Sequence, residues 1–99
     1  MARYRLTKAA LNDISAIWEY TVEAWSESQA DAYYRMLILS MEKIAIMPTA
    51  YGRLYDEVDM LLYGSKAGHH IIFYRVMSNG DILVVRVLHE RMDIKNYAY

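Results

Sequence analysis

The chain has 99 residues, no cysteine and a formal net charge of −1, with 11 Lys and Arg against 12 Asp and Glu. This length predicts one domain with a two-layer core, and the lack of cysteine excludes disulfides and Cys-ligated zinc and fits a reducing cytosol. The near-zero net charge excludes nucleic-acid binding by bulk electrostatics, and no apolar run approaches the roughly 20 residues of a membrane span. Basic residues interrupt the N-terminus, so no signal peptide is expected.

The first half of the chain predicts a strand followed by two helices. Residues 2–7 alternate weakly and are typical of a short strand, and Thr7 is the expected N-cap of a helix over 8–25. The apolar stripe of this helix is Leu11, Ile14, Trp18, Thr21 or Val22, and Trp25. A second helix is expected over 30–47, after a capping box that begins at Ser26 and before Pro48. Its stripe is Ala30, Tyr33 or Tyr34, Leu37, Met41 and Ile44, widened by Leu39 and Ile46. The short link predicts an antiparallel helical hairpin.

The second half predicts three strands. Residues 49–56 are expected to form a loop, 58–63 a short strand, 64–68 a flexible turn and 69–93 a β-hairpin. Residues 94–99 are too short for an independent element and are expected to be a mobile or partner-ordered tail. The last three strands should form an antiparallel meander against which the helical hairpin packs. The predicted fold is therefore a two-layer α+β domain over residues 1–99.

The hairpin register follows from its turn. Asn79-Gly80 between two strand-like runs favours a type I′ turn, which pairs Met77 with Ile82 and extends the ladder to His70 opposite His89. Alternation then places Ile71, Phe73, Arg75, Met77, Ile82, Val84, Arg86 and Leu88 on one face. The other face, almost wholly aliphatic in its middle, should lie on the helices. We expect Arg75 and Arg86 to share an open groove on the first face, as the centre of an interface or as simple surface ion pairs.

Other side chains carry alternative interpretations. His70 and His89 form a cross-strand pair that either closes the sheet end or shares a proton, and without a third ligand at a convincing spacing no metal site is predicted. His89, with Glu90 or Arg91 beside it, is a candidate general base. Trp18 and Trp25 are interpreted as core or interface packing. No cofactor motif is present in the sequence.

The amino-acid sequence of the second half resembles the ParE branch of the RelE/ParE toxin superfamily of type II toxin–antitoxin systems. The matching stretches are residues 68–76 (GHHIIFYRV), 80–82 (GDI) and 86–93 (RVLHERMD), and the helix pattern ending at residues 48–53 also fits. The resemblance implies a cytoplasmic bacterial toxin that inhibits DNA gyrase by binding and so blocks replication. It also implies a cognate ParD-like antitoxin that neutralises the toxin in a hetero-oligomeric complex.

RelE-like relatives cut mRNA on the ribosome, and this alternative makes different demands on the residues. The resemblance implies a phosphate-binding arginine early in the penultimate strand, where this chain has Ile71, and often a basic residue near the end, where it has Glu90. These departures count against the nuclease. If the chain is an enzyme, its residues would be Arg75, Arg86, His89 and Tyr97.

The sequence therefore predicts an interaction protein without cofactor or metal. Its expected target- or antitoxin-binding residues are Arg75, Arg86, His89, Glu90, Arg91, Trp18 and Trp25. The alternatives are a ribosome-dependent mRNA endonuclease and an antitoxin-bound relic without activity.

Overall fold

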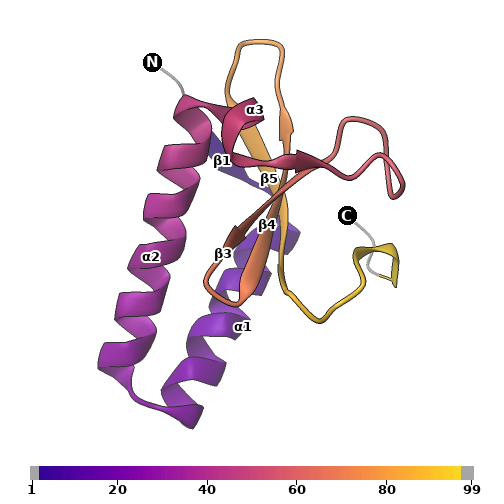
Figure 1. The fold of residues 1–99 in the computed structure, drawn as a ribbon. Helices are drawn as coiled ribbons and strands as arrows, with labels where there is room; N and C mark the ends of the chain where they lie inside the picture. Colours follow the sequence, from indigo (N-terminus) through magenta and orange to yellow (C-terminus); the bar gives the residue numbers. More distant parts are fainter. Residues whose placement is uncertain (1–2, 97–99) are drawn as a thin grey trace.

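The computed structural model describes residues 3–96, so the predictions made for Ala2, Tyr97 and Tyr99 fall outside the described residues. The elements in chain order are β1 (Tyr4–Leu6), α1 (Lys8–Ala24), α2 (Glu27–Ile46), α3 (Pro48–Tyr51), β2 (Arg53–Leu54), β3 (Tyr63–Ala67), β4 (His70–Val76), β5 (Ile82–His89) and the 3₁₀ helix η1 (Ile94–Asn96). The two long helices form an antiparallel pair along one side of a twisted sheet (Figure 1). This α+β two-layer arrangement confirms the predicted fold class.

The sheet has five strands in the order β1-β5-β4-β3-β2. The antiparallel meander of β3, β4 and β5 was predicted, whereas the two edge strands extend it. β1 lies parallel to β5, with Tyr4 opposite Ile82 and Leu6 opposite Val84. A parallel neighbour needs a long crossover, which the helical hairpin between β1 and the meander supplies.

The strand predicted at 58–63 is wrong in position. The third strand is β3, which contains Gly64 and covers most of the residues expected to be a flexible turn. Glycine is needed there because a Cβ on Gly64 would lie 2.5 Å from Cε1 of Tyr55. Residues 55–62 instead form a loop, closed by a hydrogen bond from the Tyr55 N–H to the Leu62 carbonyl. The predicted 49–56 loop is also partly regular, since it contains most of α3 and all of β2.

Thr7 and Ser26 cap the two long helices as expected, although α2 begins at Glu27, three residues before the predicted start at residue 30. The Thr7 hydroxyl accepts a hydrogen bond from the Ala10 N–H, and the Ser26 hydroxyl accepts one from the Gln29 N–H. α2 ends at Ile46, before the proline as predicted, although Pro48 then occupies the first turn of the short α3.

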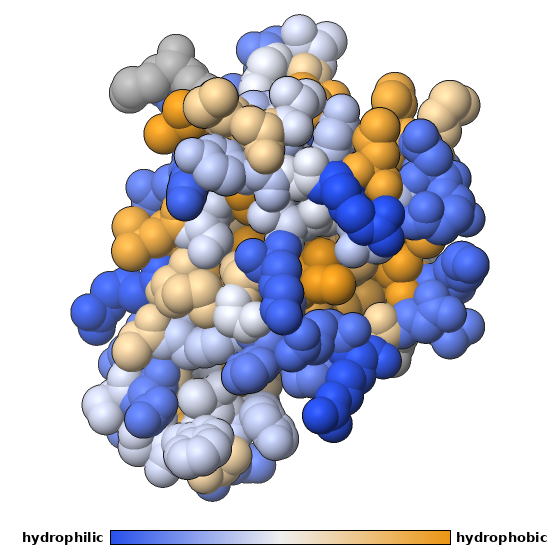
Figure 2. Space-filling model, in the orientation of Figure 1, coloured by the Kyte–Doolittle hydropathy of each residue, from blue (hydrophilic) through white to orange (hydrophobic). Residues whose placement is uncertain are grey.

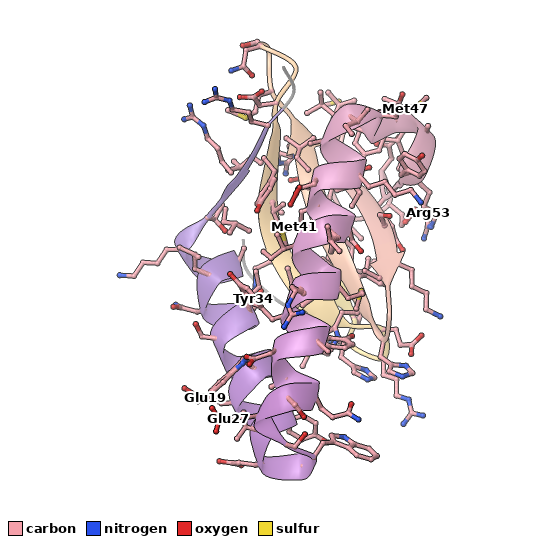
Figure 3. The ribbon with its side chains drawn as sticks, turned by 90° about the vertical axis from the view of Figure 1, so that its left-hand side faces the viewer. Glu19, Glu27, Tyr34, Met41, Met47 and Arg53 are labelled. Carbon is pink, nitrogen blue, oxygen red and sulfur yellow. The ribbon has the colours of Figure 1, made fainter. Side chains whose placement is uncertain are left out.

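The predicted buried stripe is more accurate for α2 than for α1. On α2, Ala30, Leu37, Met41 and Ile44 are buried as predicted, and Met41 projects toward the sheet in Figure 3. Leu39 and Ile46 are exposed, so the widened stripe is wrong. On α1 the buried positions are Ala10 and Ile14, and Leu11 and Trp25 face solvent. The α1 stripe is rotated because small Ala10, rather than Leu11, makes the close approach to the core.

The β4–β5 hairpin keeps the predicted register only at its far end. His70 pairs with His89 and Phe73 with Arg86, but Tyr74 then pairs with Val84, which leaves Val85 as the extra residue of a β-bulge. The turn differs too. Met77 pairs with Asp81 through a three-residue loop in which Gly80 has φ +91°, while Asn79 does not have a positive φ. A three-residue loop with a left-handed glycine replaces the predicted type I′ turn and shifts the ladder by one residue.

The bulge changes which face each β5 side chain occupies. Ile82, Val84 and Val87 pack with the helices, whereas Leu83, Val85 and Leu88 belong to a second cluster on the other face. The predicted helix-facing set for β5 is therefore wrong between the turn and the bulge, because a one-residue offset exchanges the two faces. The second cluster is covered by the 55–62 loop and by η1, whose Ile94 is buried in it. The predicted tail is thus ordered at least through residue 96, and Figure 1 shows both covering segments on the side away from the helices.

Candidate functional site

Within residues 3–96, the two arginines predicted to share a groove are each held by a different element. Arg86 turns to α1, where its Nε and a terminal nitrogen donate to the two oxygens of Asp13 at 2.7 and 2.8 Å. Arg75 turns to the 55–62 loop and donates to the Asp59 carboxylate and, at 2.9 Å, to the Met60 carbonyl. The two guanidinium groups are therefore bound by carboxylates of different elements, Arg86 by α1 and Arg75 by the 55–62 loop.

The Arg86–Asp13 pair is built into the edge of the sheet. β1 pairs with β5 only as far as Val84, and beyond it the Val87 N–H donates to Asp13 at 2.9 Å. The side chains of Arg86 and Asp13 are only 16% and 13% exposed. Asp13 thus replaces the missing neighbouring strand and neutralises the arginine. The sequence did not predict this contact, because no local pattern connects Asp13 with a strand more than 70 residues further along the chain.

The sheet end next to the helical turn gathers three histidines. The His70 and His89 rings lie 5.4 Å apart edge to face, which confirms the predicted cross-strand pair, and His69 stacks on His89 at 6.4 Å. A two-residue turn between β3 and β4 presents His69 and His70. Gly68 has φ +61° in this turn, and a Cβ there would lie 2.7 Å from the Tyr33 hydroxyl oxygen, so only glycine fits.

Tyr33 of α2 joins the helical layer to this histidine cluster. Its hydroxyl oxygen accepts the His69 N–H at 3.0 Å and lies 2.5 Å from His70 Nδ1. Burial raises the Tyr33 pKa, so the phenol stays protonated at neutral pH. Burial, followed by the nearby His89 and His69 rings, lowers the His70 pKa below its usual value of 6.5. Both groups are therefore neutral near pH 7, and Tyr33 is a site residue that the sequence offered only as part of a helical stripe.

Glu90 and the basic residues form the outer rim of the cluster. Glu90 contacts Lys66 at 3.0 Å and His69 Nδ1 at 3.1 Å. The hydrogen bond from Lys66, and then the one from His69, lowers the Glu90 pKa. The Arg91 backbone N–H donates to His89 Nδ1 at 3.2 Å, and the Arg91 side chain is exposed. Among residues 3–96, no group of three or more His, Cys, Asp or Glu side chains is placed to hold a metal ion.

A groove of about 730 Å³ runs from the histidine cluster along the helical hairpin. The side chains that line it are mostly apolar and aromatic. Two of these residues are largely exposed to solvent, Tyr20 at 69% and Trp25 at 73% of their surface. The lining residues are Ala16, Ile17, Tyr20, Thr21, Trp25, Gln29, Tyr33, His69, His70, His89 and Met92. We call this feature the histidine groove. It combines hydrophobic contact area with polar ring nitrogens, which is the composition of a binding site.

The two predicted tryptophans lie on different surfaces. Trp25 lines the histidine groove, whereas Trp18 donates from Nε1 to Asp31 at 3.0 Å beside Tyr34 on the outer side of the hairpin. Figure 3 shows this outer side, with Tyr34 between the helices and the acidic Glu19 and Glu27 near the helical turn. Of the predicted binding residues, the structure therefore brings His89 and Trp25 together in the groove, with Glu90 and Arg91 beside it. Trp18, Arg75 and Arg86 lie elsewhere.

Solved structures with the same fold are toxin–antitoxin components. One, described as the chromosomal ParDE TA system from P. aeruginosa, has a TM-score of 0.77 at 15% identity and covers 90% of this chain and 96% of that chain. Another, the toxin–antitoxin complex RelBE2 from Mycobacterium tuberculosis, has a TM-score of 0.61 at 16% identity, with 89% and 96% covered. At these identities the likeness shows the fold alone.

Sequence relatives give the narrower assignment. The family described as ParE toxin of type II toxin-antitoxin system, parDE, matches residues 4–94. Toxin ParE1 of Mycobacterium tuberculosis is 41% identical over 94% of both chains, and Toxin ParE1 of Caulobacter vibrioides is 34% identical over 96% of both. Toxin ParE of Escherichia coli is 30% identical, covering 95% of this chain and 90% of its own. The chain therefore belongs to the ParE toxin family of type II toxin–antitoxin systems.

Proposed function

We propose that this protein inhibits DNA gyrase by binding it, and that a ParD-like antitoxin holds it inactive in the bacterial cytoplasm. Membership of the ParE family supports this proposal, as do relatives named as ParE toxins over nearly their whole length. A helix that could cross a membrane is not found among residues 3–96. The toxin is proposed to act as a binding protein without chemistry of its own.

The observation that carries the choice of binding over catalysis is the state of Arg86. Cleavage of RNA needs a cation that meets the scissile phosphate and its developing charge. Arg86 already holds a carboxylate through two hydrogen bonds and is largely buried by it. A phosphate would have to displace Asp13, which also accepts the Val87 N–H. Arg75 is likewise bound to Asp59.

The second candidate is a ribosome-dependent mRNA endonuclease, and one feature favours it. His70, His89 and the Tyr33 hydroxyl form a group that can exchange protons beside an open groove. Lys66 and Arg91 lie close to the same end of the sheet, although Lys66 is paired with Glu90.

Two reactions separate the candidates. The purified toxin is added to a gyrase supercoiling reaction and, separately, to a translation reaction followed by primer extension on the message. We expect loss of supercoiling with accumulation of cleaved DNA complexes in the first reaction, and intact message in the second. Cuts in the message that follow the codon frame, with supercoiling unaffected, would replace the binding mechanism by the enzymatic one.

The antitoxin part of the proposal is tested independently of gyrase. Adding the cognate antitoxin to the gyrase reaction is expected to restore supercoiling at a stoichiometric ratio. A co-purified complex measured by light scattering provides the physical check. A toxin that binds gyrase but forms no complex with the antitoxin would contradict this part alone.

A further inference from the structure

The hydrogen bonds at Nδ1 of His89 and of His70 bear on which ring nitrogen carries the proton. The Arg91 backbone N–H can only donate, so His89 Nδ1 is an acceptor and the proton of the neutral ring sits on Nε2. Tyr33 accepts the His69 N–H, and its hydroxyl oxygen lies 2.5 Å from His70 Nδ1. We interpret the neutral phenol as the donor in this second contact. In this interpretation, neutral His70 also carries its proton on Nε2. Within residues 3–96, neither Nε2–H has an acceptor, and both rings line the groove.

The charged groups around these rings leave a place for an anion. From α1, Asp13 faces His70 but is already paired with Arg86; from α2, Tyr33 is neutral. After β5, Glu90 is held by Lys66 and His69 on the outer rim, and Arg91 is exposed beside it. The nearby carboxylates are thus engaged elsewhere. An anion entering the groove would meet two N–H donors on adjacent rings.

We propose that the histidine groove is the docking site of an acidic, apolar segment of the antitoxin, which sets a carboxylate on the Nε2–H groups of His70 and His89. The flanking apolar side chains of that segment fill the space between Tyr20 and Trp25. The inference rests on the proposed function for the existence of an antitoxin. It assigns a surface and a recognition chemistry that family membership does not supply.

A carboxylate in this position has a consequence for protons. An anion beside His70 favours the charged ring and raises its pKa on binding. The second proton goes to His70 Nδ1, where Tyr33 changes from donor to acceptor by rotating its hydroxyl. The Nδ1 atom of His89 accepts the Arg91 N–H. Docking is therefore coupled to protonation of one histidine, and the complex is tighter at pH 6 than at pH 8.

The first test locates the antitoxin with matched exposed aromatics. Tyr20→Ala and Trp25→Ala remove groove walls, and Tyr34→Ala removes a tyrosine that is 45% exposed on the outer side of the hairpin. We expect the first two to weaken antitoxin binding by about tenfold or more each, and the control by less than about twofold, as for hot-spot and rim residues. Circular dichroism checks that the variants fold. Equal affinities for all three variants would overturn the docking site.

The tryptophans provide a direct reporter. Trp18→Phe leaves Trp25 as the remaining indole, inside the groove and away from the outer surface. Binding of the antitoxin is expected to shift its emission to shorter wavelength, because docking removes water from an indole that is 73% exposed in the free toxin. An unchanged spectrum at saturation would show that the antitoxin lies elsewhere.

The second test measures the proton. Calorimetric titration of toxin with antitoxin at pH 7, in buffers of different ionisation enthalpy, gives the number of protons taken up. We expect net uptake of a fraction of one proton, and affinity that rises roughly five- to tenfold from pH 7.5 to 6.0. His70→Gln keeps an N–H donor but cannot charge, so it should abolish the uptake. His89→Phe keeps a ring but removes the second N–H donor, so it should weaken binding.

The outcomes distinguish this inference from the proposed function. Tight binding that leaves groove variants unaffected refutes the docking site and keeps the antitoxin as a partner. Tight binding in the groove without proton uptake refutes the carboxylate and points to a carbonyl or hydroxyl acceptor. No binding of the antitoxin to the unaltered toxin would refute the proposed partner itself, and the docking site with it.

Discussion

The two faces of the sheet bury similar aliphatic side chains, but their covers differ in thickness. On one face, α1 and α2 lie over Ile72, Tyr74, Ile82, Val84 and Val87. On the other, the 55–62 loop and η1 cover a smaller cluster around Phe73, Val85 and Leu88. Figure 2 shows apolar surface near the middle of the right-hand half, over the sheet between these two covering segments. Because the helices form a thicker cover than the loop and η1, we expect the helical side of the β-hairpin to be rigid and the loop side to yield.

The two arginine–carboxylate pairs follow the same division. Arg86 and Asp13, on the helical side, are both nearly buried and share a third hydrogen bond through Val87. Arg75 and Asp59, on the loop side, are 32% and 46% exposed. The loop also bears a leucine with φ +60° at position 61, and its Met60 is 73% exposed. The ion pair that holds this loop is solvated, and the loop contains a residue in the left-handed region. We therefore expect the loop to open locally before the helices separate.

The largest expected effect compares two buried leucines. Leu37→Ala on the helical side should lower the free energy of unfolding by about 3–4 kcal/mol, because flanking helices cannot close the cavity. Leu62→Ala on the loop side should cost about 2 kcal/mol, since the loop can settle onto the gap. Urea unfolding followed by circular dichroism measures both. A larger loss for Leu62→Ala would reverse the assignment of rigid and yielding sides.

The ion pairs come next. Asp13→Ala leaves the Arg86 guanidinium and the Val87 N–H without their acceptor in a largely buried place, and should cost about 2–3 kcal/mol. Asp59→Ala should cost less than about 1 kcal/mol, because solvent replaces the carboxylate. The same unfolding experiment decides. Equal costs would mean that exposure does not separate the two pairs.

Two glycines probe how far each side can move. A Cβ at Gly52 would overlap the hydroxyl of the fully buried Tyr74, which donates to the Pro48 carbonyl, so Gly52→Ala should cost about 2 kcal/mol. At Gly64 the Cβ would meet the ring of Tyr55, a half-buried side chain on the loop, so Gly64→Ala should cost about 1 kcal/mol. Thermal unfolding ranks the pair. A costlier Gly64→Ala would show that the loop is as rigid as the helices.

The smallest expected effect is a pH dependence of the free energy of unfolding, which comes from His70 on the helical side. The folded pKa of His70 lies below 6.5, so on acidification the unfolded chain takes up its proton first. The stability that neutral His70 contributes is present above pH 6.5 and is lost as the pH falls through the folded pKa. His70→Gln should flatten the dependence of the unfolding midpoint on pH below 6.5. A slope that survives in this variant would have to come from other groups.

Hairpin prediction shows where local rules were enough and where they failed. Asn79-Gly80 located the reversal, and the pairing of His70 with His89 was predicted correctly. The three-residue turn shifts the register of β5 by one residue, and the bulge at Val85 shifts it back. The predicted faces of β5 are therefore exchanged between the turn and the bulge, and the pairing beyond the bulge is as predicted. Arg86 lies beyond the bulge and keeps its predicted partner Phe73, so the register error does not reach it. The two arginines are instead separated by their side-chain partners, Asp13 of α1 for Arg86 and Asp59 of the 55–62 loop for Arg75.

The histidine groove was only half visible from the sequence. His89, Glu90, Arg91 and Trp25 were chosen as binding residues, and the structure brings them to one end of the sheet. Tyr33 and Tyr20 were missed because both are helix positions far away in the chain, and their relation to the histidines depends on how α1 and α2 dock. Gly68 was interpreted as part of a flexible turn, whereas its positive φ and contact with Tyr33 fix the turn.

By itself the sequence determined the local elements: the caps at Thr7 and Ser26, the α2 stripe, the hairpin, and a likeness specific enough to place the family. These depend on residues within a few positions of one another. The tertiary structure alone decided that β1 joins the sheet beside β5, that Asp13 closes the edge and holds Arg86, and that the groove ends on paired imidazoles. Such contacts join residues up to 78 positions apart, where packing and the burial of charge, rather than local propensity, select the partner.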